Sequence, residues 1–358
     1  MRLFLAAAAL GAIVLASVAA AAPGSAKSRM VATGGRVTAL AADGDRAAFI
    51  VRATDPTSPT CAGVKVWEPL RARVVRLQRP CPGGAANNGE GTFGPALAGT
   101  RAAWLRTGGG NFVETNIMTA TLARPKPTFA ALGAVDHSGI GTFARSPVGG
   151  GGGLAFTLER RCDSDGDLNG RPEDQCPTGK KTGDIIAATI WRLAGRSSCP
   201  YRTFHHCSRV TKDDGELTVL AVEAGRIAVR TDGAVRLITA SGRLLREFPV
   251  EARSAALSGE RLAVRTAAAV AVYNTETGNL LDSFPAAKSL RLQDLERGIL
   301  VTASSGTVTL RRLGTDNKTT LRPGGTAFAQ LERPGLFVAA HRRLTFTPMR
   351  DVLRLLSG

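Results

Sequence analysis

The feature that most constrains this chain is a repeat of 36 residues in its C-terminal part. Gly242, Gly278 and Gly314 follow one another at this interval, each inside a short turn between two runs of alternating apolar residues. A further step of 36 residues reaches Arg350, again between two apolar runs. Alternation with a period of two on both sides of a glycine turn is typical of β-hairpins. The repeat therefore predicts a series of β-hairpins.

A second repeated phrase, a glycine followed within a few residues by a short apolar run, extends this pattern over the whole chain. Its seven copies begin at Gly44, Gly99, Gly153, Gly225, Gly259, Gly298 and Gly335. Together with its hairpin, each copy predicts a unit of four short strands, such as residues 217–223, 226–231, 234–239 and 244–250. One small sheet cannot bury both apolar faces, so such units stack. The sequence predicts an all-β fold, a seven-bladed β-propeller of four-stranded antiparallel blades. How the ring closes stays open, with residues 29–33 as a candidate to complete the last blade. A helical solenoid is disfavoured, because no segment after the N-terminal apolar run keeps a 3.6-residue period beyond three turns.

Residues 272–284 carry the clearest family resemblance. The run Val-Tyr-Asn-Thr-Glu-Thr-Gly-Asn-Leu-Leu-Asp-Ser-Phe resembles the third-strand, turn and fourth-strand hairpin of secreted bacterial propellers with WD40-like or quinoprotein-like repeats. Asp282 stands where quinoprotein repeats carry a tryptophan. The period is shorter than the roughly 40–45 residues of a WD40 blade. The resemblance implies a β-propeller, and the absence of that tryptophan argues against docking of a quinoprotein cofactor.

The N-terminus predicts export. Arg2 precedes an uncharged apolar run that ends at Ala22, and small residues follow, as in a secretory signal peptide. We expect residues 1–26 to form this signal, with cleavage between about residues 21 and 26, and residues 27–358 to form a single propeller domain without a transmembrane span. An uncleaved membrane anchor is the alternative, since the run is about 20 residues long. The predicted location is secreted or extracytoplasmic, in the cell envelope.

Six cysteines in an exported chain indicate disulfides. They fall as near neighbours, so the predicted pairs are Cys61 with Cys81, Cys162 with Cys176, and Cys199 with Cys207. Each pair would close a short loop between hydrophobic runs. A zinc site is disfavoured, because the sequence has no C-x-x-C motif.

The third unit is the longest, with an insertion over residues 161–207 around its expected third strand at 184–192. Before it, the glycine run 149–153 predicts a flexible turn, because no helix follows to form a phosphate cradle. Oxygen donors inside the insertion have the spacing of a calcium loop; the candidate ligands are Asp163, Asp165, Asp167, Asn169 and Asp174. This segment resembles a thrombospondin type 3 calcium repeat, although Leu168 and Arg171 depart from that motif. The alternative is an acidic insertion that pairs with nearby Arg and Lys residues.

Charge and motifs limit the possible functions. With 44% hydrophobic and 21% charged residues, the chain is neither disordered nor a multi-span membrane protein. The net charge of +17 comes mostly from arginines spread over all repeats, which argues against specific nucleic-acid binding. We expect a protein or an anionic cell-envelope polymer as partner, and a monomer. No catalytic set is evident: there are four histidines (His137, His205, His206 and His341) and no G-x-S-x-G motif.

Three functions remain open. The first is an exported binding or interaction module with a calcium-stabilised loop. The second is a propeller lyase or hydrolase that acts on an anionic polysaccharide through arginines and His137 or His341. The third is a structural protein of the envelope. Convergence of one of these histidines with an acid and an arginine in one cleft would favour the enzyme.

Overall fold

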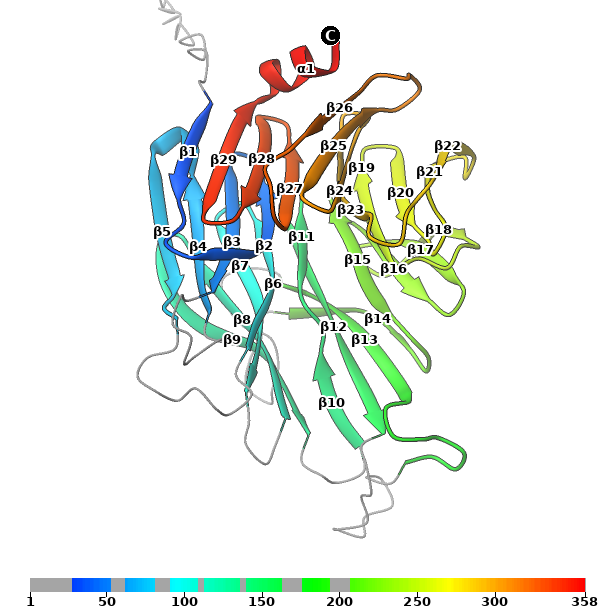
Figure 1. The fold of residues 1–358 in the computed structure, drawn as a ribbon. Helices are drawn as coiled ribbons and strands as arrows, with labels where there is room; N and C mark the ends of the chain where they lie inside the picture. The colour runs from blue at the N-terminus through cyan, green and yellow to red at the C-terminus, as the bar shows by residue number, and fades with distance from the viewer. Residues whose placement is uncertain are drawn as a thin grey trace, which may run out of the picture.

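The computed structural model confirms a seven-bladed β-propeller. It describes residues 28–52, 62–80, 91–108, 113–135, 140–162, 176–193 and 207–357. These residues form seven antiparallel sheets arranged around a common axis (Figure 1). The innermost strands contact one another in a closed series, β2, β6, β11, β15, β19, β23, β27 and again β2.

The first three blades hold the N-terminal half of the chain. Blade 1 contains β2 (Arg36–Asp43), β3 (Arg46–Arg52), β4 (Ala62–Glu68) and β5 (Arg73–Gln78), with a 3-10 turn at Pro69–Arg71. Blade 2 contains β6 (Gly91–Ala98), β7 (Arg101–Gly108), β8 (Val113–Thr121) and β9 (Arg124–Val135). Blade 3 contains β10 (Ile140–Ala144), β11 (Val148–Gly150), β12 (Gly153–Cys162), β13 (Ile185–Leu193) and β14 (Cys207–Asp213).

The other four blades follow the 36-residue repeat. Blade 4 contains β15 (Thr218–Glu223), β16 (Arg226–Thr231), β17 (Ala234–Thr239) and β18 (Leu244–Phe248). Blade 5 contains β19 (Ser254–Ser258), β20 (Arg261–Arg265), β21 (Ala269–Asn274) and β22 (Leu280–Pro285). Blade 6 contains β23 (Arg291–Glu296), β24 (Ile299–Ser304), β25 (Thr307–Arg312) and β26 (Lys318–Leu321). Blade 7 contains β27 (Ala327–Glu332), β28 (Gly335–Ala340), β29 (Arg343–Pro348) and, from the N-terminus, β1 (Arg29–Ala32).

The hydrophobic core lies between the blades. Among the described residues, buried apolar side chains form seven clusters, one for each pair of adjacent blades. Trp104 of blade 2, for example, is fully buried in one cluster with Ile50 and Val66 of blade 1. Each blade therefore needs both neighbours to cover its apolar faces, which is why the repeat forms a ring.

Blade 7 corrects the expectation at the C-terminus. The step to Arg350 predicts another hairpin, but Met349–Ser357 form helix α1, whose buried residues Met349, Val352 and Leu356 pack on blades 6 and 7. The outer strand of blade 7 is β1 instead, which pairs antiparallel with β29 from Arg29 opposite Phe346 to Ala32 opposite Arg343. In Figure 1 β1, in blue, lies beside β29, in red.

Blade 3 also differs from its neighbours. Its innermost strand is divided into β10 and β11, which both pair with β12. The glycine run predicted as a flexible turn is partly strand: Gly149 and Gly150 belong to β11, and the turn is at Gly151 and Gly152. Both turn glycines have positive φ, at 53° and 79°, which only glycine adopts easily.

Candidate functional site

The ring encloses a central cavity of about 560 Å³, lined by residues of all seven blades. It lies at the end where the first strand of each blade turns into the second, for example at Asp43–Arg46. We call this end the first-turn face and the other end the opposite face. On a chain with net charge +17, the cavity is lined by five acids, Asp43, Glu223, Asp294, Glu296 and Glu332, which we call the acidic ring.

Four members of the acidic ring are the last residue of a first strand, and three of these join their blade to the next one. Asp43 accepts a hydrogen bond from the backbone N–H of Gly99, Glu223 accepts one from Gly259 at 2.9 Å, and Glu332 accepts one from Gly44 at 3.1 Å. In each pair the carboxylate and the glycine belong to neighbouring blades. Sequence reasoning used the repeated glycines and overlooked the acid that precedes several of them, although that signal was visible.

Asp294 and Glu332 are the members whose ionisation the fold changes most. Burial raises the pKa of Asp294 to about 7, although its carboxylate accepts hydrogen bonds from the backbone N–H groups of Leu331 (2.7 Å) and Leu295 (2.8 Å). Burial, with Asp294 nearby, raises the pKa of Glu332 to about 9. Glu332 therefore keeps its proton at neutral pH, and the acidic ring carries less charge than its composition indicates.

The hydrogen bonds of the acidic ring thus hold neighbouring blades together. Within the described ranges, no group of three or more His, Cys, Asp or Glu residues is arranged to hold a metal ion.

A basic cleft of about 680 Å³ lies on the opposite face, between blades 6, 7 and 1. We call it the His341 cleft; its lining residues are Arg36, Arg291, Ser305, Gly306, Gly325, Thr326 and His341. His341 lies in the turn between β28 and β29, with φ of 53°. Its imidazole packs against Gly325, where a Cβ would lie 2.6 Å from the ring.

The two arginines of the cleft are positioned by neutral groups. Arg36 donates to the hydroxyl of Thr326 at 3.3 Å. Arg291 donates to the carbonyl of Ala327 at 2.6 Å and stacks 5.0 Å above the ring of Phe328, and burial lowers its pKa. In the part of the chain that the structure describes, neither arginine forms an ion pair, and no carboxylate lines the cleft. The cleft presents positive charge and hydroxyl groups, which suits recognition of an anion.

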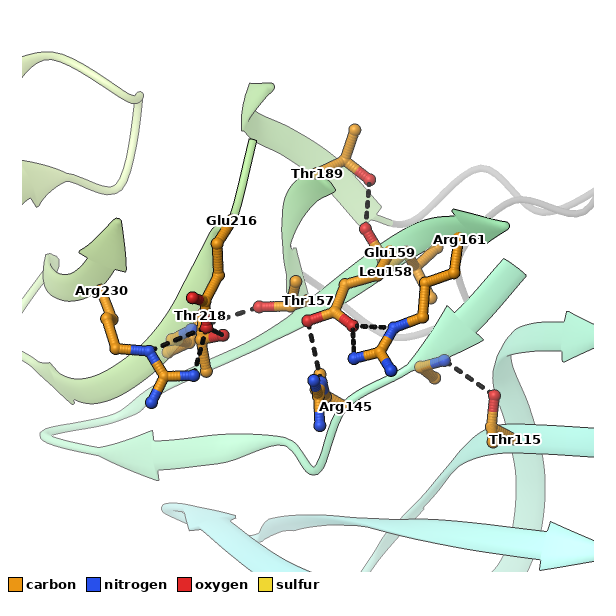
Figure 2. A network of polar contacts seen from close by, with 12 residues as sticks. Thr115, Arg145, Thr157, Leu158, Glu159, Arg161, Thr189, Glu216, Thr218 and Arg230 are labelled. Atoms are coloured by element: carbon orange, nitrogen blue, oxygen red, sulfur yellow. Dashed lines mark hydrogen bonds and ion pairs between the residues drawn. The ribbon is translucent and has the colours of Figure 1, made fainter. Parts of the chain in front are cut away.

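A network of ion pairs around Glu159 in blade 3 stabilises the fold and is not part of a binding site (Figure 2). Glu159 is fully buried and accepts hydrogen bonds from Arg145 and Arg161, each with Nε at 2.8 Å. Nearby, the hydroxyl of Thr157 accepts the backbone N–H of Val219 in blade 4 at 3.2 Å. Since the innermost strand of blade 3 is divided, its second strand makes part of the contact with blade 4.

Most of the predicted site residues lie outside the described residues. These are the five candidate calcium ligands Asp163, Asp165, Asp167, Asn169 and Asp174, the cysteines Cys61, Cys81 and Cys199, and the histidines His137, His205 and His206. Of the predicted disulfides, the structure describes the bond between Cys162 and Cys176, with Cα atoms 5.5 Å apart. Cys207 is also disulfide-bonded. His341 is the one predicted functional candidate that the structure places in a cleft, and its neighbours Arg36 and Arg291 were not predicted.

Comparison with known proteins assigns no family. No protein-family model matches the chain, and no curated protein sequence matches it. Among solved structures, Hsv2 of Kluyvelomyces marxianus is 10% identical, with 85% of this chain and 88% of that chain covered and a TM-score of 0.48. Sqt1 of Saccharomyces cerevisiae is 11% identical, with 73% and 97% covered and a TM-score of 0.35. The C-terminal WD40 domain of Sif2 is 8% identical, with 90% and 99% covered and a TM-score of 0.45. At such values these likenesses give no information on function.

No helix within the described ranges is long and apolar enough to cross a membrane.

Proposed function

We propose that this chain is an exported propeller that works as an interaction module and binds an anionic partner, a protein or a cell-envelope polymer, through the His341 cleft. The observation that carries the proposal is the pair Arg36 and Arg291, which line one cleft with His341 and have no carboxylate partner among the described residues. Guanidinium groups held by neutral neighbours keep their donors available for a ligand's oxyanion. The ligand then supplies the missing negative charge.

The alternative of a lyase or hydrolase is less well supported. Acid–base cleavage of a glycan uses a group that gives a proton and a group that takes one. His341 is one titratable group of this kind, but the described residues that line the cleft include no carboxylate to work with it. The hydroxyls of Ser305 and Thr326 add hydrogen-bond donors and suit binding.

We further propose that the segment between Cys162 and Cys176 binds one calcium ion. The disulfide closes a loop with a sequence separation of 14, and its two ends continue into blade 3. Asp163, Asp165, Asp167, Asn169 and Asp174 supply oxygen ligands at odd positions and at position twelve. A bound dication neutralises the repulsion between these acids. Calcium then stabilises the segment between Cys162 and Cys176 without a catalytic role.

Binding to two anionic polymers tests the main proposal. Polygalacturonate and polyphosphate are titrated into the purified protein at about 50 and 300 mM NaCl, with the double variant Arg36→Ala, Arg291→Ala. We expect the variant to lose about tenfold or more in affinity for at least one polymer. The matched control removes the same charge from exposed residues on the same face, as Arg253→Ala with Lys288→Ala.

Equal losses in the two double variants would mean that general positive charge binds the polymer, and would overturn the assignment to the cleft. Shortening of polygalacturonate on long incubation, lost in His341→Ala, would replace the binding module with the enzyme. Binding that depends on the cleft without cleavage supports the proposal.

A further inference from the structure

An arginine occupies the same position of the repeat in four blades, at the start of the second strand. These residues are Arg46, Arg101, Arg226 and Arg261. Each one pairs in register with the last residue of the first strand in its own blade; the partners are Asp43, Ala98, Glu223 and Ser258, in the same order. The four blades therefore allow one arginine to be compared in four surroundings.

In blades 1 and 4 a carboxylate neutralises this arginine. Arg46 donates to Glu68 at 3.0 Å and also forms an ion pair with Asp45 at 3.0 Å. Arg226 donates to Glu223 at 2.7 Å and to the carbonyl of Gly259 in blade 5. In blade 5, the exposed Arg261 lies against Gly298 of blade 6, where a Cβ would be 2.4 Å from its Nη1.

In blade 2 the carboxylates are missing. Ala98 stands at the repeat position of Glu223, and Thr100 at that of Asp45. Thr121, which pairs in register with Arg101, stands at the position of Glu68. Within the described part of the chain, the side chain of Arg101 has no ion pair and no hydrogen bond. Burial lowers its pKa, but a guanidinium stays charged in a protein. A partly buried charge without a partner is unfavourable, and a ligand's anion would relieve this cost.

The unpaired Arg101 lines a groove of about 680 Å³ between blades 2 and 3 on the first-turn face. Arg124, Thr100 and Thr121 contribute the other polar groups; the remaining lining residues are Ala98, Ala123, Gly152, Leu154 and Leu193. Arg124 is exposed and forms no ion pair with any described residue. Blade 3 has Gly153 at the position of the repeated arginine. A Cβ at the neighbouring Gly152 would meet no atom within 4 Å. This absence of side chains keeps the groove open.

We infer that this groove binds an acidic side chain from a short, partly apolar peptide segment of a partner protein. The partner's carboxylate neutralises Arg101, as Glu68 neutralises Arg46 and Glu223 neutralises Arg226. The accessible apolar groups of the groove favour a peptide over a polysaccharide, because the methyl groups of Ala98 and Ala123 match aliphatic side chains that a uronic acid polymer lacks. The site differs from the His341 cleft in face, blades and ligand chemistry, so it goes beyond the proposed function.

A pair of end-blocked peptides tests the inference. One peptide alternates Leu and Glu, and the other replaces each Glu with Gln; binding to the full protein is measured by calorimetry at about 100 mM NaCl. We expect only the Leu–Glu peptide to bind, and Arg101→Gln to weaken it about tenfold or more. The matched control is Arg261→Gln, the same change at the same repeat position in a blade whose arginine is exposed, which should leave the affinity unchanged.

A second variant supplies the missing carboxylate from within the chain. Thr121→Glu places a carboxylate opposite Arg101, as Glu68 lies opposite Arg46. We expect it to raise the melting temperature and to abolish peptide binding, because the internal carboxylate competes with the ligand. A stabilised variant that still binds the peptide fully would overturn the inference. So would trigalacturonate binding that depends on Arg101 without any peptide binding.

The double variant Arg36→Ala, Arg291→Ala separates this inference from the proposed function. It should bind the Leu–Glu peptide normally. Loss of peptide binding in that variant would assign the peptide to the His341 cleft and overturn the inference about the groove.

Discussion

Replacing Glu332 with glutamine should stabilise the folded protein at neutral pH. Glu332 lies in the acidic ring, where burial and the nearby Asp294 raise its pKa from 4.5 to about 9. In the unfolded chain this carboxyl ionises above pH 4.5, whereas in the folded chain it keeps its proton until about pH 9. The stability of the wild-type protein therefore falls between these two pH values. Glu332→Gln removes this loss, and its amide oxygen still accepts the N–H of Gly44.

The size of the effect follows from the same pKa. Each pH unit between 4.5 and the folded pKa costs about 1.4 kcal/mol, so the upper bound at pH 7.5 is about 4 kcal/mol. We expect a smaller gain in the free energy of unfolding, of about 1–2 kcal/mol. Solvent at the opening of the central cavity and relaxation of the protein around the ionised Glu332 reduce the cost of its ionisation. The gain should shrink to below about 0.5 kcal/mol at pH 4.5, where the carboxyl is protonated in the folded chain and only half ionised in the unfolded chain.

Urea denaturation of both proteins at pH 4.5, 6, 7.5 and 9 measures this difference, and titrating groups that do not interact with Glu332 cancel in it. The matched control is Glu223→Gln in the same ring. Glu223 forms an ion pair with Arg226 at 2.7 Å, so its replacement should lower the free energy of unfolding, by up to about 1 kcal/mol at pH 7.5. If Glu332→Gln were as destabilising as Glu223→Gln at pH 7.5, the folded protein would hold Glu332 ionised, and the reasoning would be wrong.

Three further predictions concern blade 3 and its insertion. Calorimetric titration with calcium should show one site in the wild-type protein and none in the double variant Asp165→Ala, Asp174→Ala; unchanged binding would exclude the loop. Replacing Cys162 and Cys176 together by serine should lower the free energy of unfolding by about 3 kcal/mol, because the disulfide closes a loop of about 15 residues. A loss below about 1 kcal/mol would show that the loop is ordered without the bond. Glu159→Gln should cost about 2–3 kcal/mol in chemical denaturation, because it leaves two arginines around a neutral buried group; an unchanged midpoint would contradict the role of the network.

The fold was predictable because its information is local and repeated. Each blade consists of hairpins between neighbouring strands, so alternation and turn glycines within about 36 residues suffice to predict it. The errors lie where one repeat departs from the others. Residues 349–357 continue the spacing but form α1, because β1 already occupies the outer edge of β29.

The candidate sites were harder to predict, because they form between blades. Arg36, Arg291 and His341 belong to three different blades, and no local pattern connects them. The hydrogen bond from the N–H of Gly44 to Glu332 likewise joins the first blade to the last. Arg101 lies in one copy of the repeated glycine phrase. Its lack of a carboxylate partner becomes significant only when the ion pairs of Arg46 and Arg226 at the same repeat position are known. The predicted calcium ligands lie outside the described residues.

The position of β1 in blade 7 has a consequence for how this molecule is made. A ribosome delivers the N-terminal end first, so β1 emerges before every other strand of the ring and its partner β29 only after the other six blades. Until then β1 has no edge to join, and six blades must assemble with an open gap in the circle. During that interval the free strand of one molecule can join the unfinished blade of a neighbour, so folding at high concentration favours strand-exchanged dimers of this protein.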